Sequence, residues 1–231
     1  MRLIFIRHGD PDYVHDTLTE KGKREAELLA QRVKNWDVSK FYVSPLGRAQ
    51  LTAEYSLKLR GDTAETLPWL REFNGIIPTS DGGHRIPWDM YPTEWADKEI
   101  YYDRNNWFKS DYMQTGNVEE QLKWVHEGID KLLADHGYIH ENGMFRIEKH
   151  SDETLVFFCH FGVSMVMIGH ILGISTMNMW HGFNMQPTSV TVLGCEEREG
   201  DYGHVMGCTK HLAGGNEPIS NAGYFTDVFQ D

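Results

Sequence analysis

The stretch Arg-Leu-Ile-Phe-Ile-Arg-His-Gly-Asp-Pro, residues 2–11, decides the fold class of this chain. Its apolar run at residues 2–6 is typical of a buried strand, and the glycine and proline that follow His8 predict a loop. Farther along, Thr17 and Glu20 have the spacing of a capping box, and apolar residues recur at near-helical spacing up to about residue 35. The chain is therefore expected to begin with a strand, a loop and a helix.

The same cycle of strand, loop and helix recurs twice. Residues 40–43 form a short predicted strand, which precedes a turn at 44–47 and a helix from 48 to 59. Residues 154–159 are a strongly apolar strand, followed by an apolar helix from 162 to 172. Strands that alternate with helices imply a largely parallel sheet with helices on both faces. We therefore predict an α/β fold, a three-layer sandwich in which helices flank a mostly parallel central sheet.

The rest of the chain contains fewer regular patterns. One face of residues 118–136 is apolar, which predicts a helix, and the polar residues 137–153 are expected to form a loop. Alternating patterns at 188–193 and 202–206 predict a closing pair of strands, joined by a charged turn at 196–200.

Residues from about 73 to 115 interrupt the alternation of strands and helices. Tryptophan, tyrosine and phenylalanine crowd this segment among Pro, Gly and Asp. Such a cluster usually forms only a satellite core, yet its position directly after Glu72 favours an aromatic-rich lid over a site. We predict a single domain over residues 1–231, with this lid inserted at about 73–115.

Composition limits the classes of function. The chain has 231 residues and a formal net charge of −12, which argues against a nucleic-acid partner, because such partners require a dominant basic surface. Its 3 cysteines include no Cys-x-x-Cys pair, so neither a disulfide framework nor a zinc knuckle is predicted. No signal-peptide pattern is visible, and the apolar residues 163–174 fall short of the roughly 20 that span a bilayer. We expect a cytoplasmic protein that does not bind membranes.

The ends of the predicted strands carry groups that suit phosphate. In open α/β sheets, ligands bind beyond the carboxyl ends of the strands. These positions supply Arg7 and His8 after the first strand, Arg48 after the second, and His160 after the late strand. A nucleophilic imidazole with two guanidinium groups is the set of side chains that phosphoryl transfer needs. His160 is expected to add a hydrogen-bond donor, and the amide groups that open the following helix a favourable dipole.

Four ordered motifs resemble those of the histidine phosphatases, a family that includes the cofactor-dependent phosphoglycerate mutases. They are Arg-His-Gly at 7–9, Ser-Pro-Leu-Gly-Arg-Ala-Gln-Leu-Thr-Ala at 44–53, Leu-Arg-Glu-Phe-Asn-Gly at 70–75 and Phe-Cys-His-Phe-Gly at 158–162. An isolated Arg-His-Gly is usually a surface turn. The order and spacing of all four motifs make the resemblance specific over most of the chain, except for the aromatic insertion and the tail after about residue 206.

The resemblance implies a phosphatase that hydrolyses a small-molecule phosphate monoester through a phosphohistidine. His8 would be the nucleophile, and Glu72 would protonate the leaving oxygen. No metal and no other cofactor is implied. The phosphate pocket would contain Arg7, Arg48, His160 and Phe161. Phe161 stands where a glycine commonly follows the second histidine. By position alone, Asp10, Asp81 or Asp89 could replace Glu72 as the acid.

Two alternatives to hydrolysis stay open. A phosphoglycerate mutase would return the phosphoryl group to the product, but mutases of the family usually carry Glu-Ser-x-x-Asn-like residues after Arg-His-Gly, whereas this chain has Asp-Pro-Asp-Tyr at 10–13. A non-catalytic module that binds a phospholigand would keep the pocket without turnover. Hydrolysis is favoured because every candidate catalytic residue is present.

Two further patterns are weaker. Cys159 could be the nucleophile of a cysteine phosphatase, but no arginine closes a phosphate loop shortly after it, so a buried filler is the better interpretation. His136 and His140 lie four residues apart and could chelate a metal on a helix. Gly137 lies between them and no carboxylate partner is evident, so solvated surface is favoured.

Overall fold

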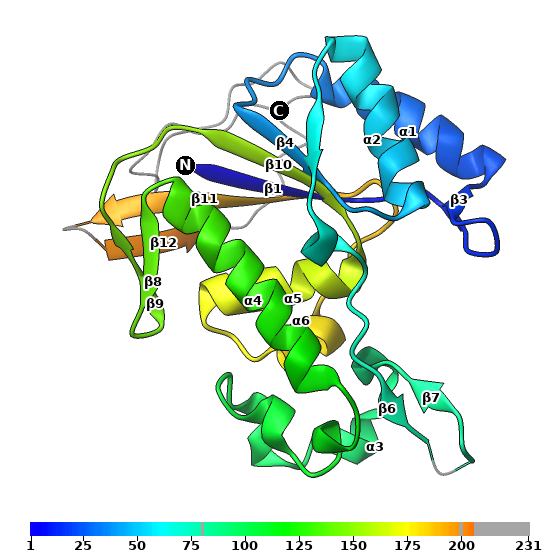
Figure 1. Cartoon of the computed structure of the whole chain (residues 1–231), viewed down its shortest axis with the longest axis vertical. Helices are drawn as coiled ribbons and strands as arrows, with labels where there is room; N and C mark the ends of the chain where they lie inside the picture. Colours follow the sequence, from blue (N-terminus) through cyan, green and yellow to red (C-terminus); the bar gives the residue numbers. More distant parts are fainter. Residues whose placement is uncertain (80, 199–200, 206–231) are drawn as a thin grey trace.

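A computed structural model describes residues 1–79, 81–198 and 201–205, and its centre is a six-stranded sheet (Figure 1). The four strands β1, β10, β4 and β5 pair in parallel, and β11 and β12 add an antiparallel edge next to β1. In sheet order the strands are β12 (Asp201–Val205), β11 (Val190–Arg198), β1 (Arg2–Arg7), β10 (Thr154–Cys159), β4 (Lys40–Val43) and β5 (Ala64–Thr66). The predicted mostly parallel sheet is confirmed.

Both faces of the sheet are covered, as the apolar character of its strands requires. In β1, Leu3 and Phe5 belong to one buried cluster, whereas Ile4 and Ile6 belong to the other. Successive side chains of a strand point to opposite faces, so a strand buried on both sides is a continuous apolar run. The three-layer sandwich predicted from the sequence is therefore confirmed.

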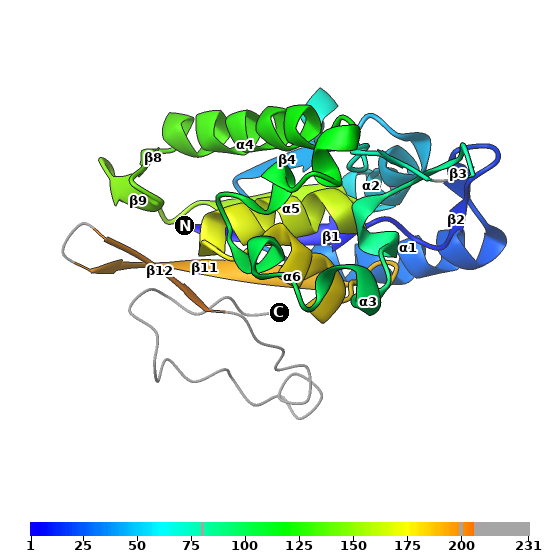
Figure 2. The ribbon, with the colours of Figure 1, turned by 90° about the horizontal axis from the view of Figure 1, so that it is seen from below.

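The helices divide between the two faces (Figures 1 and 2). Side chains of α1 (Glu20–Val33) and α2 (Gly47–Arg60) join the cluster of Ile4 and Ile6. Side chains of α4 (Val118–Asp135), α5 (Phe161–Leu172) and α6 (Thr176–Gly182) join the cluster of Leu3 and Phe5, and α4 packs against α5. None of the helices in the described ranges is both long and apolar enough to cross a membrane.

The first helix begins later than the predicted capping box. Its N-cap is Thr19, whose hydroxyl accepts a 3.0 Å hydrogen bond from the amide of Gly22. Thr17 instead lies in β3 (Thr17–Leu18), which pairs with β2 (Pro11–Asp12). This two-stranded ribbon keeps Thr17 extended, so the prediction that it caps the helix is wrong.

The prediction of a loop at residues 137–153 is also wrong, because a β-hairpin occupies most of this segment. Strand β8 (Tyr138–Glu141) pairs with β9 (Met144–Ile147). Between them, Asn142 and Gly143 have φ of 54° and 75°, which suits the two-residue turns that follow the twist of a hairpin. The hairpin is anchored by two fully buried aromatic side chains, those of Tyr138 and Phe145. The Asn142-Gly143 pair, which is typical of hairpin turns, was the feature of this polar segment that could have predicted the hairpin.

The closing strands are present, with shifted bounds. Strand β11 runs through residue 198 and so takes in part of the turn predicted at 196–200, and β12 ends at residue 205. Residues 199–200 of that turn, residue 206 and Cys208 lie outside the described residues.

The predicted insertion at about 73–115 contains short elements that pack into the main core. Trp107 and Met113, for example, are buried in the same cluster as α4 and α5. In chain order these elements are β6 (Ile77–Pro78), β7 (His84–Arg85), the 3₁₀ turn η2 (Pro87–Asp89), α3 (Pro92–Trp95), and the 3₁₀ turns η3 (Glu99–Tyr102), η4 (Trp107–Lys109) and η5 (Met113–Thr115).

Candidate active site

Strand register gathers the candidate site at one edge of the sheet. Arg7 is opposite Cys159 in the parallel pair of β1 and β10, so the next residue of each strand, His8 and His160, leaves the sheet at the same level. Their imidazole centroids are 5.0 Å apart. Ser44 follows β4 at the same edge, where its amide donates a hydrogen bond to Phe158 of β10. The two histidines that the sequence placed at strand ends are therefore neighbours.

His8 is held in one tautomer. Its Nδ1 is 2.7 Å from the carbonyl oxygen of Gly9, which can only accept, so Nδ1 carries the proton and Nε2 carries a lone pair. The pKa of His8 is lowered to about 4, mainly by burial and in part by the nearby charges of Arg48 and Arg7, against the opposing effect of the Gly9 hydrogen bond. The side chain is therefore neutral at neutral pH, which is the form a nucleophile requires.

The loop after His8 rests on backbone and hydroxyl contacts. The Gly9 amide donates a 3.0 Å hydrogen bond to Oγ1 of Thr52, and that hydroxyl donates a 2.7 Å bond to the carbonyl of Arg48. A Cβ on Gly9 would lie 2.7 Å from the carbonyl oxygen of Gly22, so the loop and α1 touch backbone to backbone. Glycine is required here because no side chain fits between the two segments.

Arg48 is buried and paired. Its Nη1 donates a 2.6 Å hydrogen bond to Oδ1 of Asp16, and its guanidinium lies 5.4 Å from the centre of the Tyr13 ring. The other carboxylate oxygen of Asp16 accepts a 2.7 Å bond from the Gly47 amide, just before Arg48 in α2. The Nε of Arg48 is buried and has no partner within the described part of the chain.

Arg7 is half-buried and is oriented by the backbone. Its Nη1 donates a 2.5 Å hydrogen bond to the carbonyl of Met185, while its buried Nε has no partner among the residues that the structure describes. Arg7 and Arg48 thus each have an unpaired guanidinium N–H in the described structure, and both lie near enough to His8 for their charges to lower its pKa. Two such donors are suited to the oxygens of a phosphate group.

His160 is fully buried, and its Nε2 lies 2.7 Å from Oγ of Ser44. That hydroxyl oxygen also accepts a 3.2 Å bond from the Leu46 amide. Burial, together with the charge of Arg48, holds the pKa of His160 well below its usual range, so the ring is neutral. Its Nδ1 has no hydrogen-bond partner within the described ranges.

Glu72 contacts the start of α5. Its Oε1 accepts hydrogen bonds from the amides of Phe73, at 2.8 Å, and Val163, at 3.0 Å. Burial nevertheless raises the pKa of Glu72, and the charge of Arg48 acts in the opposite direction. A Cβ on Gly162 would lie 2.8 Å from Oε1, which explains the glycine. The amides at the start of α5 were expected to face phosphate. One of them, the Val163 amide, instead donates to the Glu72 carboxylate.

The remaining predicted residues have other contacts. The half-buried Phe161 ring packs edge-on against Trp88, at 6.1 Å between centroids, and its contact with phosphate stays a prediction. Asp10 accepts a 2.6 Å bond from the Thr19 hydroxyl. Of the other two alternative acids, Asp81 bonds within its own turn and Asp89 is exposed. The charge of the buried Arg48 acts on the pKa of Glu72, which associates this carboxylate with the site of His8.

Several site residues were not predicted. Ser44 follows a strand and could have been found by that rule. Thr52 lies inside a quoted motif but carries no visible signal of its contact with Gly9. Asp16 lies in a loop and Trp88 in the 3₁₀ turn η2. The fold brings Asp16 to Arg48 and Trp88 to Gly162, and residue spacing along the sequence does not indicate either neighbour.

Cys159 lacks the properties of a nucleophile. Its side chain is fully buried, and its sulfur lies 3.1 Å from the Ser164 hydroxyl. Burial raises the pKa of the thiol to about 12, so it stays protonated at neutral pH. Because the thiolate is the reactive form, the cysteine-phosphatase alternative is removed, and the interpretation of Cys159 as a buried filler agrees with the structure.

Comparison with known proteins decides the family. The model of the histidine phosphatase superfamily (branch 1) matches residues 3–205. The chain belongs to this superfamily. The resemblance drawn from the four motifs is therefore confirmed, and so is the predicted class of enzyme, a phosphatase.

Individual members of the superfamily resemble the chain to different extents. Phosphoserine phosphatase 1 of Hydrogenobacter thermophilus is 26% identical over 211 residues, which cover 86% of this chain and 88% of that protein. A probable phosphoglycerate mutase of Yersinia pestis is 47% identical, but only over 87 residues, 33% of this chain and 40% of that protein. The crystal structure of a phosphoserine phosphatase from Entamoeba histolytica with 3-phosphoglyceric acid has a TM-score of 0.57 and 22% identity, covering 91% of this chain and 98% of that one.

Proposed function

We propose that this histidine phosphatase hydrolyses a small-molecule phosphate monoester through a phosphohistidine on His8. One observation carries the proposal: Nδ1 of His8 donates to the Gly9 carbonyl, which leaves the Nε2 lone pair of a neutral imidazole beside two arginines. A fixed, unprotonated nitrogen near fixed positive charge is suited to attack at phosphorus.

In the first step, Nε2 of His8 forms a bond to phosphorus while the bond from phosphorus to the ester oxygen breaks. The equatorial oxygens would accept hydrogen bonds from Arg7 and Arg48, whose Nε groups are buried without partners in the described structure. If Ser44 donates to Nε2 of His160, the proton of that imidazole lies on Nδ1, which is then a third, neutral donor.

Glu72 is proposed as the proton donor to the departing alkoxide. Burial raises the pKa of Glu72, which favours the protonated form that an acid needs. In the second step, the Glu72 carboxylate would accept a proton from water as the water oxygen attacks phosphorus. That attack breaks the bond to His8, releases inorganic phosphate and restores both side chains.

The substrate is proposed to be a small phosphorylated metabolite with an alkyl leaving group. Support comes from the Hydrogenobacter relative, which is named for phosphoserine, and from the similar structure of a phosphoserine phosphatase bound to 3-phosphoglyceric acid. A mutase is the second candidate, favoured by the locally similar Yersinia protein. Activity that requires a bisphosphorylated primer would identify a mutase, whereas release of inorganic phosphate without a primer supports hydrolysis.

The decisive experiment traps the intermediate. Rapid quench of the wild type with ³²P-labelled substrate should give an acid-labile, base-stable phosphoenzyme, and His8→Ala should abolish both the label and turnover. Cys159→Ser is the matched control, because its thiol is buried and protonated; it should keep the label. Label on serine or cysteine would overturn the mechanism. Absence of turnover by the wild type on p-nitrophenyl phosphate and on a panel of phosphorylated metabolites would instead favour a binding module.

A further inference from the structure

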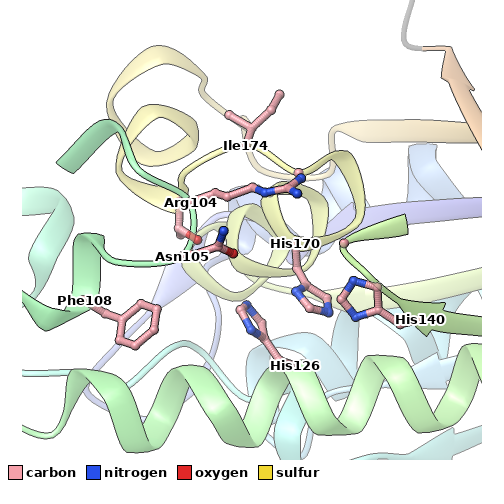
Figure 3. A pocket seen from close by; sticks show the side chains of 11 residues that line it. Arg104, Asn105, Phe108, His126, His140, His170 and Ile174 are labelled. Atoms are coloured by element: carbon pink, nitrogen blue, oxygen red, sulfur yellow. The ribbon is translucent and has the colours of Figure 1, made fainter. Parts of the chain in front are cut away.

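A second group of titratable side chains lies away from His8 and has no part in the proposed reaction (Figure 3). His126 and Asp130 lie four residues apart on α4, and thus on one face of that helix. His140 comes from β8 of the hairpin, and His170 from the last turn of α5. The site of His8 and His160 adjoins the opposite, N-terminal end of α5.

The ligand atoms of three of these residues already converge. Oδ1 of Asp130 is 2.8 Å from Nε2 of His170, and its Oδ2 is 3.0 Å from Nδ1 of His140. All three residues offer an atom within 4.8 Å of the others. Around a tetrahedral Zn²⁺ with bonds of about 2.0 Å, ligand atoms are roughly 3.3 Å apart. Each imidazole nitrogen is therefore already near this distance from the Asp130 carboxylate, and a closer approach of the three ligand atoms, which now lie within 4.8 Å of one another, would bring them into one coordination shell.

His126 provides an independent indication of a ligand. Its Nε2 is buried and has no hydrogen-bond partner within the described structure, although buried polar atoms are nearly always paired. The His126 ring stacks on that of His170, with centroids 3.8 Å apart and planes 22° from parallel. Packing alone does not explain a third imidazole whose buried nitrogen is unpaired, beside a carboxylate and two other imidazoles, because an apolar side chain would fill the same space without that cost.

A pocket of about 190 Å³ gives access to the three imidazoles. His126, His140 and His170 all line it, and Figure 3 shows their rings gathered together, with Arg104 beyond them. The pocket has room for a water molecule as an additional ligand, or for the exchange of one.

From this geometry we infer that Asp130, His140 and His170 form a binding site for a divalent transition-metal ion of the Zn²⁺ type. Two imidazoles and one carboxylate are a donor set that Zn²⁺ commonly takes, and the fourth position is available to water from the pocket, or to His126 once its ring turns out of its stack on His170. The bound ion would tie α4, the β8–β9 hairpin and α5 together, at the end of α5 remote from the reaction.

The chain supplies a matched control for this site. His136 ends α4 and also pairs with a carboxylate: its Nδ1 lies 2.8 Å from Oε2 of Glu153. Its Nε2 lies 3.2 Å from the Tyr42 hydroxyl, and no second imidazole joins this group in the described chain. The two histidines that the sequence paired as possible chelators thus belong to separate clusters, and only His140 has metal-binding neighbours.

The test is metal binding by the full chain after removal of metals with a chelator. Equilibrium dialysis against Zn²⁺ should give one ion per chain, and Co²⁺ should show the visible absorption of a tetrahedral site. His140→Ala and His170→Ala should weaken Zn²⁺ binding at least tenfold, and His136→Ala should leave it unchanged. Circular dichroism of the metal-free variants identifies any that fail to fold; for those, His140→Gln or His170→Gln is measured instead.

A second readout separates this site from the pair of histidines in the active site. Zn²⁺ should raise the melting temperature of the wild type and of His8→Ala equally, and should not raise that of His140→Ala. Loss of Zn²⁺ binding in His8→Ala would place the ion in the phosphatase site and overturn the inference. Absence of stoichiometric binding by the wild type, or equal binding by folded His140→Ala and His170→Ala, would overturn it as well.

Discussion

The carboxylate of Asp16 joins two parts of the active site, because one oxygen accepts from Nη1 of Arg48 and the other from the amide of Gly47. Asp16 adopts a φ of 47°, in the left-handed region that Asp and Asn tolerate better than most residues. The loop before α1 thereby fixes the direction of the Arg48 guanidinium. We regard Asp16 as a positioning residue.

Removal of the Asp16 side chain should misdirect Arg48. For Asp16→Ala we expect kcat/KM to fall by about 10- to 100-fold, because small displacements of a charged clamp have effects of that order. Asp16→Asn keeps an acceptor oxygen and tolerates the same φ, so it should recover most of the loss. Asp12→Ala is the control, because within the described structure that carboxylate bonds to His15 and to the Val14 amide of the same loop and not to Arg48. Equal kcat/KM for Asp16→Ala and Asp12→Ala would contradict the positioning role.

Thr52 should affect turnover through the Gly9 amide. Thr52→Val removes the hydroxyl that accepts from Gly9 and leaves a buried amide unpaired, at a cost of about 1–3 kcal/mol in the free energy of unfolding. We expect kcat to fall at least severalfold with little change in KM, since the Gly9 carbonyl orients His8. Thr52→Ser should rescue kcat. Chemical denaturation and steady-state kinetics measure the two effects, and failure of the serine variant to restore kcat would argue for a packing role.

The pH profile of kcat/KM should be set by His8 on its acid side. Because the pKa of His8 is lowered to about 4, its Nε2 gains a proton only as the pH falls through that value, and activity is lost there rather than near 6.5. The substrate's own ionisation near pH 6 must first be corrected for. For alkyl phosphates, activity should also decline as the pH rises through the raised pKa of Glu72, when the acid loses its proton. A corrected acid limb centred near pH 6.5 would show that His8 is not desolvated.

Glu72→Gln should distinguish leaving groups. An alkoxide departs poorly without a proton, whereas p-nitrophenolate leaves unaided. The phosphorylation rate should therefore fall by about 10²–10⁴-fold for alkyl phosphates and much less for p-nitrophenyl phosphate. Because Glu72 would also serve as base in the second step, burst kinetics must isolate the first. Equal losses for both substrates, or a selective loss in a variant of Asp10, Asp81 or Asp89, would assign the acid elsewhere.

Trp88 is the residue through which the aromatic segment should influence specificity. It packs against Phe161, and a Cβ on Gly162 would lie 2.5 Å from the Trp88 ring, at the start of α5. Trp88→Ala should change the ranking of natural substrates by kcat/KM while sparing p-nitrophenyl phosphate. Tyr91→Ala, an exposed aromatic of the same segment, is the control. Deletion of the whole segment would be uninformative, because it supplies buried residues such as Trp107 to the core. If the ranking of substrates is unchanged in Trp88→Ala, the aromatic segment contributes to packing and not to specificity.

Local patterns predicted most of the fold. The strands at residues 2–7, 40–43 and 154–159 are apolar because both sheet faces are buried, and this property is visible in the sequence. The hairpin at 138–147 was not predicted, because only two of its residues, Tyr138 and Phe145, are fully buried and its sequence therefore lacks a regular apolar pattern. The start of α1 was misplaced because the pairing of β2 with β3 overrode a capping pattern at Thr17.

The candidate site was predictable where residues follow strands, as for His8 and His160. It was not predictable where a side chain is bound by a residue distant in sequence. Examples are the ion pair of Asp16 with Arg48 and the hydrogen bond from the Val163 amide to Glu72. Both contacts form only once the helices have packed. The three-residue cluster around Asp130 belongs to the same class, since its members come from α4, β8 and α5.

The pairing of β1 with β10 has a consequence for how the enzyme matures. The two strands, at residues 2–7 and 154–159, are far apart in the sequence, and the neighbouring histidines meet only after a long loop of chain has closed. Contacts of this kind form slowly because the entropy of loop closure must be lost before they stabilise anything. A nascent chain on the ribosome therefore cannot assemble its two-histidine centre until strand β10 has emerged. During refolding, the return of activity should then lag behind the return of helical signal.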